Sequence, residues 1–540
     1  MSTAIPLPPV AEPAALYDRR HGAACALTSL VIGLGQSLAI WGVNNNLPAL
    51  QGALGATAAE ASWLSTAYFA TALSAIVPLT KLRLQFGIER FAIWGIALFA
   101  AVTLWYVVAP GLGTAIAARA ALGLAATPLS TLAVFYMIQA VPAPLAPVGA
   151  VLGFGTLQLG SPLARVVAQP LFDAAPGMGV PVFDLAVALL GVAAITAVPL
   201  RGQPRRKVLN AGDLPAFVLY ATGLALLCIV VTQGRIRWWT DTPWLGTCLW
   251  LGIVCLGAYV VFDLWRDEPL VDLRWLAGPT MRWLVLAVLL FRIGLSEQTT
   301  GAVGLMNALG LTNDDMRVLF AWVTLGIVAG FGVVVVALAL RWVRPALLLS
   351  LGLITTGALM DATATSLTRP HDILASQILI AVATAIFLGS TFALGLLPVF
   401  QDGQRNIVSF LAMFVGAQNM GSLVGSAWLG TYVADQQSGH VARLIETLTL
   451  ADPQVVTRAT QNAAAHAATI VDPLLRGVVG VSTLAQQVIS QAGVLAYGDF
   501  FRRIAVVPAL TFVWLAVYWT VSWWRQRGVA VAQPASGALP

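Results

Sequence analysis

The chain has 540 residues, of which 59% are hydrophobic and only 10% carry a charge. Ordinary soluble domains carry about a quarter charged residues, so this composition and the mean hydropathy of +0.84 exclude a soluble globular protein and predict an integral membrane protein. The formal net charge of +6 does not point to nucleic acid, because the only lysines are Lys81 and Lys207 and the arginines are scattered between apolar segments.

Apolar segments of about 20 residues, long enough to cross a bilayer as helices, recur along the whole chain. Six precede a basic linker at 201–207, two follow it, and six more follow a polar hinge that ends at Arg282. The predicted spans are 26–49, 63–82, 91–109, 113–138, 145–169, 181–200, 215–233, 245–265, 283–306, 317–340, 345–362, 373–397, 407–431 and 503–525. We therefore expect an all-α polytopic membrane protein with about fourteen transmembrane helices.

The positions of the positive charges predict how these spans are oriented, because loops rich in Lys and Arg remain in the cytoplasm. With an even number of spans and both termini inside, most of the 29 Lys and Arg residues fall in inner segments. The first segment is read as a tail rather than a cleaved signal. The predicted organisation is a cytoplasmic tail at 1–24, a first six-helix half at 25–200, a linker with two extra helices at 201–282, a second half at 283–525 and a cytoplasmic tail at 526–540.

One predicted loop, at 432–501, is far longer than the others and lies on the outer side of the membrane. Residues 441–448 and 464–470 within it favour helix, so we expect a small helical cap that stands off the membrane. Loops of this length are usually functional or disordered. A site for docking a partner and an ordinary long loop remain the two alternatives for this segment.

Sequence patterns typical of enzymes are absent from the chain. A P-loop requires lysine followed by Ser or Thr, but Leu82 and Val208 follow the two lysines, and no serine lies in a GxSxG motif. The four histidines have no metal-ligand spacing, and the four cysteines form no CxxC pattern. We therefore expect no enzymatic activity, no cofactor and no bound metal.

The segment 291–300 is the most informative part of the chain, because it places two opposite charges inside an apolar span. A charge at the middle of a bilayer costs about 3 kcal/mol or more and usually faces a bundle interior or a watery path. Arg292 and Glu297 are five residues apart, a rotation of about 140° on a regular helix. Each is therefore expected to find its partner on another helix, and Glu297 is predicted to be the central carboxylate.

Further polar residues in the spans are candidates for lining a cavity. Arg119 lies deep in the fourth span, whereas Arg165 lies near the outer end of the fifth and could extend to the interface. The remaining candidates are Trp41, Asn44, Asn45, Gln158 and Gln418. Asp184 and Asp361 lie near predicted helix ends and are not counted as central acids. The three arginines Arg119, Arg165 and Arg292 therefore face a single central acid, Glu297. We therefore expect a net positive cavity and an acidic ligand.

Several short motifs together resemble a known family. They are Val43-Asn44 with Leu47-Pro48, residues 61–68, Arg119 with Gly123, Gly160-Ser161-Pro162, residues 268–274 and residues 421–425. On these motifs the chain resembles the major facilitator superfamily, in its fourteen-span drug:proton antiporter branch of the EmrB type. The resemblance covers most of 26–525 and implies the major facilitator fold, with two six-helix halves plus two extra helices.

The resemblance also implies a function and partners. Proteins of this branch are multidrug efflux antiporters of the inner membrane that exchange substrate for protons and form tripartite pumps with a periplasmic adaptor and an outer-membrane channel. By analogy the adaptor docks on 432–501.

The chain departs from the family at three positions. Leu84 stands where an aspartate is usual, Ala39 where an acid is common, and Leu122 where glutamine is usual. Glu297 is then the expected substitute proton carrier.

The leading hypothesis is secondary active, proton-coupled efflux of amphipathic, acidic small molecules by alternating access. Protons, the substrate and the lipid bilayer are the expected partners, together with the adaptor and channel. Two alternatives stay open at this point. One is an uncoupled facilitator or importer of a small metabolite, which the missing acid at Ala39 favours. The other is a membrane scaffold or receptor that does not transport.

Overall fold

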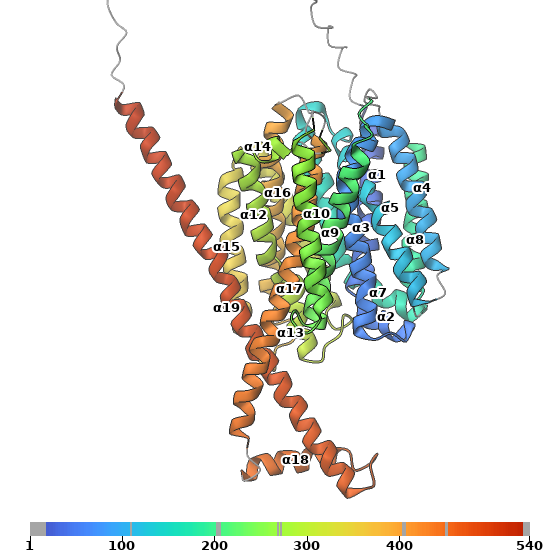
Figure 1. The fold of residues 1–540 in the computed structure, drawn as a ribbon. Coiled ribbons are helices and arrows are strands. Elements are labelled where there is room, and N and C mark those ends of the chain that lie inside the picture. Colours follow the sequence, from blue (N-terminus) through green and yellow to red (C-terminus); the bar gives the residue numbers. More distant parts are fainter. Residues whose placement is uncertain are drawn as a thin grey trace, which may run out of the picture.

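The computed structural model describes residues 18–108, 111–175, 177–200, 207–266, 269–270, 273–401, 407–448 and 452–532. Every regular element in this part of the chain is helical (Figure 1). Thirteen of its segments are long and apolar enough to cross a membrane, and α17, with 41 residues, runs through the bundle beside them. The prediction of an all-α fold with about fourteen membrane helices is thus confirmed.

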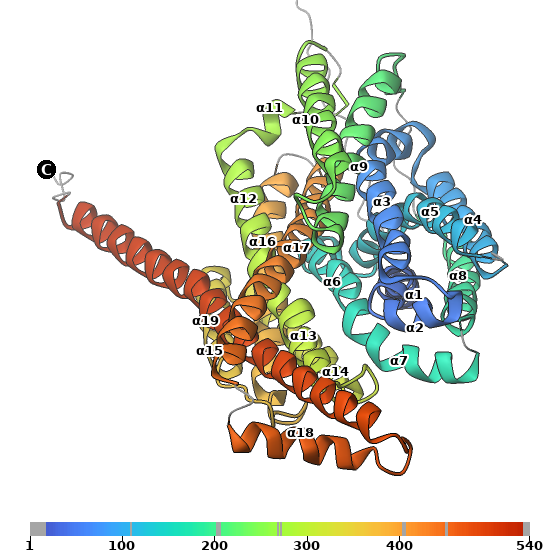
Figure 2. The same ribbon diagram turned by 60° about the horizontal axis from the view of Figure 1, so that its bottom comes forward.

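The first half contains the helices up to residue 197. They are α1 (Arg19–Asn44), the short α2 (Leu47–Leu54), α3 (Ala58–Phe86), α4 (Ile88–Val107), α5 (Leu112–Gln139), α6 (Ala146–Gln158), α7 (Gly160–Ala174) and α8 (Gly179–Ala197). Since α1 begins at Arg19, the end of the segment predicted to be a tail is helical; residues 1–17 lie outside the described part. Figure 2 shows this half, blue to teal, beside the second half.

The remaining helices form the linker pair and the second half. They are α9 (Asp213–Arg237), α10 (Pro243–Leu264), α11 (Leu273–Leu276), α12 (Pro279–Gly294), the π-helical segment η2 (Glu297–Ala302), α13 (Val303–Ala308), α14 (Arg317–Ala339), α15 (Val343–Asp361), α16 (Leu374–Gln401), α17 (Ile407–Thr447), α18 (Pro453–Ala465) and α19 (Pro473–Ala532). In Figure 1 the ends of the bundle are marked by the 207–212 linker segment at the top, here named the linker end, and by α2 at the bottom, here named the α2 end.

Three spans that the sequence predicts to be continuous are interrupted. The first ends at Asn44, and the chain turns before α2 starts at Leu47. The fifth breaks at Leu159 between α6 and α7, next to Pro162, whose missing N–H weakens the helix there. The ninth changes from α-helix to π-helix at Glu297. Single π-helical turns are rare and often lie at functional sites.

Polar contacts fasten the two extra helices to the first half. On α3, Lys81 forms an ion pair of 2.7 Å with Asp213 of α9, and Arg266 reaches the same carboxylate oxygen at 2.7 Å. Deeper in the bundle, the Gln233 side-chain amide donates to Ser62 and Thr66 of α3, each at 2.9 Å. Hydrogen bonds between transmembrane helices stabilise their packing, so these contacts hold α9 against α3.

The segment 432–501 is largely helical, and most of its helix belongs to extensions of two helices of the bundle. Helix α17 continues without a break to Thr447, and α19 begins at Pro473 and runs on through the last span, so two helices of the bundle extend past its α2 end with α18 across them (Figure 1). Residues 441–447 are helical, as predicted. Residues 464–470 were predicted to be helical, but α18 ends at Ala465 and turns follow, which corrects that prediction.

Glycine allows α19 to approach the π-helical segment closely. A Cβ atom on Gly301 would lie 2.5 Å from Cε1 of Phe500, whereas one on Gly294 would meet nothing within 4 Å. We expect Gly301→Ala to lower the free energy of unfolding by about 1–3 kcal/mol, because it overpacks a tight interface. Thermal unfolding of the purified protein measures this, with Gly294→Ala as the matched control; equal melting temperatures for the two variants would contradict the packing described.

Candidate functional site

A central cavity lies between the two halves of the bundle. It is lined from the first half by α1, α5, α6 and α7 and from the second by α12, η2, α14, α16 and α17. Its polar lining residues include Gln36, Trp41, Ser130, Gln158, Ser161, Arg292, Gln298, Thr299, Gln418 and Asn419, and its apolar ones Phe154, Leu157, Phe320, Val323 and Ile327. Apolar walls with a few convergent polar groups are typical of small-molecule sites.

Arg292 is the one charged residue among the described lining of this cavity. It lies in the last turn of α12, and its Cβ is held against α17, where a Cβ on Gly421 would be only 2.9 Å away. Its Nε is buried, and no described residue accepts a hydrogen bond from it. A buried guanidinium with a free donor is well suited to hold a carboxylate, because that contact satisfies both charge and hydrogen bonding.

Two predicted cavity residues contact each other across the halves. The Gln418 side-chain amide on α17 donates a hydrogen bond of 3.0 Å to the side-chain oxygen of Gln158 on α6. Trp41 lines the same cavity from α1 and packs edge-on against Phe69, with ring centroids 6.4 Å apart. These three predicted residues and Arg292 are therefore brought together in the structure.

A pair of buried acids lies beside the cavity. Glu297 in η2 is 1% exposed and Asp361 at the end of α15 is 2% exposed. The side-chain amide of Gln377 on α16 donates to both carboxyl groups, at 3.2 Å to Glu297 Oε1 and 2.6 Å to Asp361 Oδ2. The Ser376 hydroxyl donates to the other oxygen of Asp361. Three helices thus converge on two acids that share one amide.

Hydrogen bonds connect this acid pair to the cavity. Gln298, which follows Glu297 in the chain and lines the cavity, donates a hydrogen bond of 3.0 Å to the main-chain oxygen of Gln377. On the same segment, the Ser296 hydroxyl donates to the main-chain oxygen of Arg292 at 3.1 Å. A change at either the acid pair or Arg292 can therefore reach the other through one short stretch of backbone.

The expectation that Glu297 is the only central acid is wrong. Asp361 was placed at a helix end and left out of the interior, but α15 delivers it to Glu297 from the end of its span. Asp184 on α8 is also buried, with 2% exposure. None of these three acids is part of the described cavity lining, where Arg292 is the charged residue, so the net positive cavity stays a prediction.

Arg119 does not line the cavity. Its side chain is fully buried in the first half, where Nη1 donates to the main-chain oxygen of Ala39 at 2.6 Å and Nε to that of Leu64 at 3.4 Å. The guanidinium also lies 4.6 Å from the ring centre of Tyr68. A main-chain carbonyl of α1 thus takes the place of the acid that Ala39 lacks, and the role of Arg119 as a cavity charge is corrected to one in helix packing.

Arg165 belongs to a polar cluster that joins the halves at the α2 end. Although its position in the span would allow it to extend to the interface, it is 6% exposed. Its Nη1 donates to Asn313 Oδ1 at 2.5 Å and its Nη2 to Asn45 Oδ1 at 3.3 Å. Asn313, in the segment before α14, in turn donates to the Asn45 main-chain oxygen at 2.8 Å and to the Asn46 side chain at 3.0 Å. We name these four residues the Asn313 cluster.

Asn44 lies apart from both the cavity lining and this cluster. Its side-chain oxygen accepts a hydrogen bond of 2.5 Å from Ser65 on α3, so Asn44 joins two helices of the first half.

The sequence did not indicate Asn313 as a site residue, because Asn313 lies in a short polar segment between two spans. Its pairing with Asn45 is visible only when the two halves are folded together.

The Asn313 cluster joins the two halves at the α2 end, and its loss is expected to open that end. Asn313→Ala removes three hydrogen bonds worth about 1 kcal/mol each, and the sum shifts the population of open molecules about a hundredfold. Labelling of a Ser161→Cys variant by an impermeant thiol reagent added at the α2 side measures this shift. Asn307→Ala, at an exposed position nearby, is the control; equal labelling in both variants would show that the cluster does not act as a gate.

Comparison with known proteins agrees with this fold. Over 275 residues the chain is 25% identical to mfsC, a major facilitator superfamily multidrug transporter of Aspergillus fumigatus, and the match covers 51% of this chain and 52% of the relative. The chain thus matches about half the length of that protein. No family model matches the chain.

Solved structures with the same fold cover almost the whole chain. The crystal structure of the human organic anion transporter MFSD10 superposes with a TM-score of 0.53 at 11% identity, over 91% of this chain and 99% of that one. A bacterial homologue of the human drug peptide transporters PepT1 and PepT2 gives a TM-score of 0.55 at 12% identity, over 93% and 99%. At this level of identity the superpositions establish a shared fold.

Proposed function

We propose that this chain, which has the major facilitator fold, is a proton-coupled efflux transporter for amphipathic, acidic small molecules. The buried Glu297–Asp361 pair gives the strongest support to proton coupling. Arg292 in the central cavity gives the support for an acidic substrate. The similarity to a multidrug transporter supports the transport of several amphipathic compounds rather than one metabolite.

The acid pair has the chemistry of a proton site. Two carboxylates that share one amide repel each other when both are ionised, because like charges at close range repel by about 4 kcal/mol at an effective dielectric constant of about 20. Apolar surroundings add the cost of desolvation. A single amide, that of Gln377, cannot neutralise two carboxylates, so the pair holds a proton whenever it is enclosed. Proton loss then requires water to reach the pair, which happens when one side of the transporter opens.

The membrane potential supplies a direction for the exchange. With both acids protonated and no substrate at Arg292, the site carries one positive charge, which an inside-negative potential draws inward. With a carboxylate at Arg292 and one of the two acids ionised, the site carries one negative charge, which the same potential drives outward. Each charge gains about 2.3 kcal/mol per 100 mV. Antiport of protons for an organic anion is therefore strongly favoured by the potential.

The test of this proposal is accumulation of substrate against its gradient. A carboxylate is first selected by its binding to the purified protein, and liposomes containing the protein are then given an imposed pH gradient. We expect accumulation in acid-loaded liposomes and its collapse when a protonophore is added. Equilibration without accumulation, insensitive to the protonophore, would support the uncoupled facilitator and overturn proton coupling.

Cotransport of proton and anion is the second candidate, and one observation favours it. When the site is empty, the positive charge of Arg292 balances the one negative charge of the singly protonated acid pair. When a carboxylate binds together with a second proton, the net charge of the site is again zero. The two candidates differ in the relative direction of the fluxes. Substrate leaving the liposomes draws protons in under antiport and carries protons out under cotransport.

We also propose that the protein acts at the inner membrane with both termini in the cytoplasm, as part of a tripartite pump. The extension of α17, α18 and α19 beyond the α2 end supports a periplasmic adaptor as the partner (Figure 1).

The start of α19 presents an apolar surface for this contact. The exposed fractions of Leu474, Val478 and Val481 are 82%, 66% and 53%. Leu474→Asp with Val478→Asp should abolish capture of the adaptor and spare transport in liposomes; unchanged capture would argue against docking here.

A further inference from the structure

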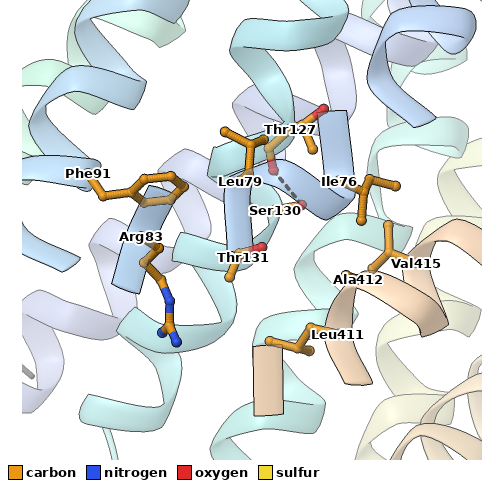
Figure 3. Close-up of a pocket in the computed structure, with 10 residues that line it drawn as sticks. All are labelled: Ile76, Leu79, Arg83, Phe91, Thr127, Ser130, Thr131, Leu411, Ala412 and Val415. Atoms are coloured by element: carbon orange, nitrogen blue, oxygen red, sulfur yellow. Dashed lines mark hydrogen bonds between the residues drawn. The ribbon is translucent and has the colours of Figure 1, made fainter. Parts of the chain in front are cut away.

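A second pocket lies between the halves toward the linker end. It is formed by Ile76, Leu79 and Arg83 of α3, Phe91 of α4, Thr127, Ser130 and Thr131 of α5, and Leu411, Ala412 and Val415 of α17 (Figure 3). Two of these residues, Ser130 and Val415, also line the central cavity. The two spaces therefore meet at a shared wall, and we name the second one the Arg83 pocket.

Arg83 is the one charged residue in the described lining of this pocket, and no acidic residue of the described chain forms an ion pair with it. It is 5% exposed, and its Nε and Nη1 are buried with no hydrogen-bond acceptor in the described part of the chain. Its guanidinium carbon lies 4.6 Å from the ring centre of Phe135. A buried charged donor left without an acceptor is costly, so a ligand that supplies an acceptor would be bound favourably.

The charge of Arg83 persists at neutral pH. The residue lies beyond Leu79, where the apolar part of α3 ends, and burial lowers its pKa to about 10. The guanidinium is therefore protonated at pH 7 and attracts anions. On the α5 side of the same pocket, the hydroxyls of Thr127 and Ser130 donate to main-chain oxygens of α5. The Thr131 hydroxyl lines the pocket beside them and can donate to an oxygen of a bound anion.

We propose that the Arg83 pocket is a second anion-binding site, which holds the carboxylate of a substrate on its way between the linker end and Arg292. The identity of the anion as a transported substrate rests on the proposed function, whereas the binding of an anion at Arg83 does not. Both halves contribute walls, since α3 and α5 belong to the first half and α17 to the second, so rocking of the halves widens or closes the pocket. The guanidinium selects anions before they meet the central cavity.

The test measures the charge preference of the pocket with small reagents rather than with a substrate. In a variant whose four cysteines are replaced by alanine, Thr131→Cys places a thiol on the pocket wall. Its labelling rates with anionic sulfonatoethyl methanethiosulfonate and cationic trimethylammonioethyl methanethiosulfonate are each divided by the rate with a free thiol. We expect a normalised ratio about tenfold in favour of the anionic reagent, because a nearby charge in a partly buried pocket is weakly screened.

Three further variants determine whether Arg83 causes that preference. Arg83→Gln should bring the ratio near unity, Arg83→Lys should keep it, and Arg90→Gln, at an exposed site on the same end, should leave it unchanged. A ratio that Arg83→Gln does not alter, or that Arg90→Gln lowers equally, would overturn the proposal. If Arg83→Gln fails to fold, Arg83→Met, which preserves the packing on Phe135, makes the same test.

These labelling rates are independent of transport, so the two proposals fail separately. If transport in liposomes is not proton-coupled but the labelling ratio still favours the anionic reagent, the proposed function is refuted and the anion site stands. If the Thr131→Cys protein with Arg83 intact gives a labelling ratio of unity while transport is proton-coupled, the anion site is refuted and the proposed function stands. In a transport assay, Arg83→Gln should raise the KM for a carboxylate about tenfold with little change in kcat, whereas a purely structural role would lower kcat.

Discussion

Liposomes containing the Glu297→Gln variant are expected to equilibrate a carboxylate substrate but not to accumulate it. The amide keeps the shape of the side chain and its contact with Gln377 while it removes the group that gains and loses a proton. Because Glu297 is 1% exposed, a neutral replacement should be tolerated by the fold. Accumulation driven by an imposed pH gradient is the measurement, with thermal unfolding as the check on folding.

The matched control for this change is Glu89→Gln, since Glu89 is exposed at the linker end. It should accumulate substrate like the unmodified protein. Asp361→Asn should also lose coupling, because the remaining acid no longer shares its proton with a second carboxyl group. Gradient-driven accumulation by Glu297→Gln, at a rate equal to that of Glu89→Gln, would remove Glu297 from the mechanism.

The Arg292→Gln variant is expected to bind carboxylate substrates about tenfold to a hundredfold more weakly. A hydrogen bond between charged groups contributes about 1.5–3 kcal/mol, and Arg292 is the one charged residue in the described lining of the cavity. The methyl ester of the same substrate should lose little affinity, because it carries no charge for the guanidinium to bind. Equilibrium binding to purified protein measures both ligands.

Arg282→Gln is the control for Arg292, because it removes an exposed arginine from the start of the same helix. It should leave the preference for acid over ester unchanged. Equal losses of affinity for acid and ester in Arg292→Gln would mean that the residue shapes the cavity without binding the carboxylate. The acid–ester comparison thus separates recognition of charge from a general change in packing.

The number and order of the membrane helices could be predicted because bilayer thickness fixes the length of an apolar segment. The interruptions could not, since the polar residues 296–300 mark a polar site within the span 283–306 but do not indicate the change from α-helix to π-helix at Glu297. The rotation of about 140° between Arg292 and Glu297 assumed a regular helix. The structure nevertheless places them apart, Arg292 on the cavity and Glu297 on Gln377.

The acid pair shows most clearly what sequence alone leaves out. Glu297 was found because its charge lies in the middle of a span, whereas Asp361 is the last residue of α15 and looked like an interfacial charge. Gln377 carries no charge and lies 80 residues from Glu297. An uncharged bridge between distant helices leaves no local pattern, and only the packing of α15 and α16 on η2 reveals it.

Three predicted residues changed role for a similar reason. Arg119 satisfies main-chain carbonyls within the first half, and Arg165 and Asn45 join the halves through Asn313. Depth along the span identified Arg119 as buried, but it placed Arg165 near the outer interface. The direction in which a side chain points depends on the rotation of its helix within the bundle, which composition and spacing do not determine.

Substrate-driven proton flux tests the role of the acid pair most directly. Liposomes containing the protein are loaded with a carboxylate substrate, diluted into weakly buffered medium, and followed with an internal pH indicator. Substrate efflux should acidify the interior in the unmodified protein and in Glu89→Gln, and produce no pH change in Glu297→Gln or Asp361→Asn. A proton flux that persists undiminished in both of the latter variants would contradict the assignment of the Glu297–Asp361 pair as the site of proton exchange.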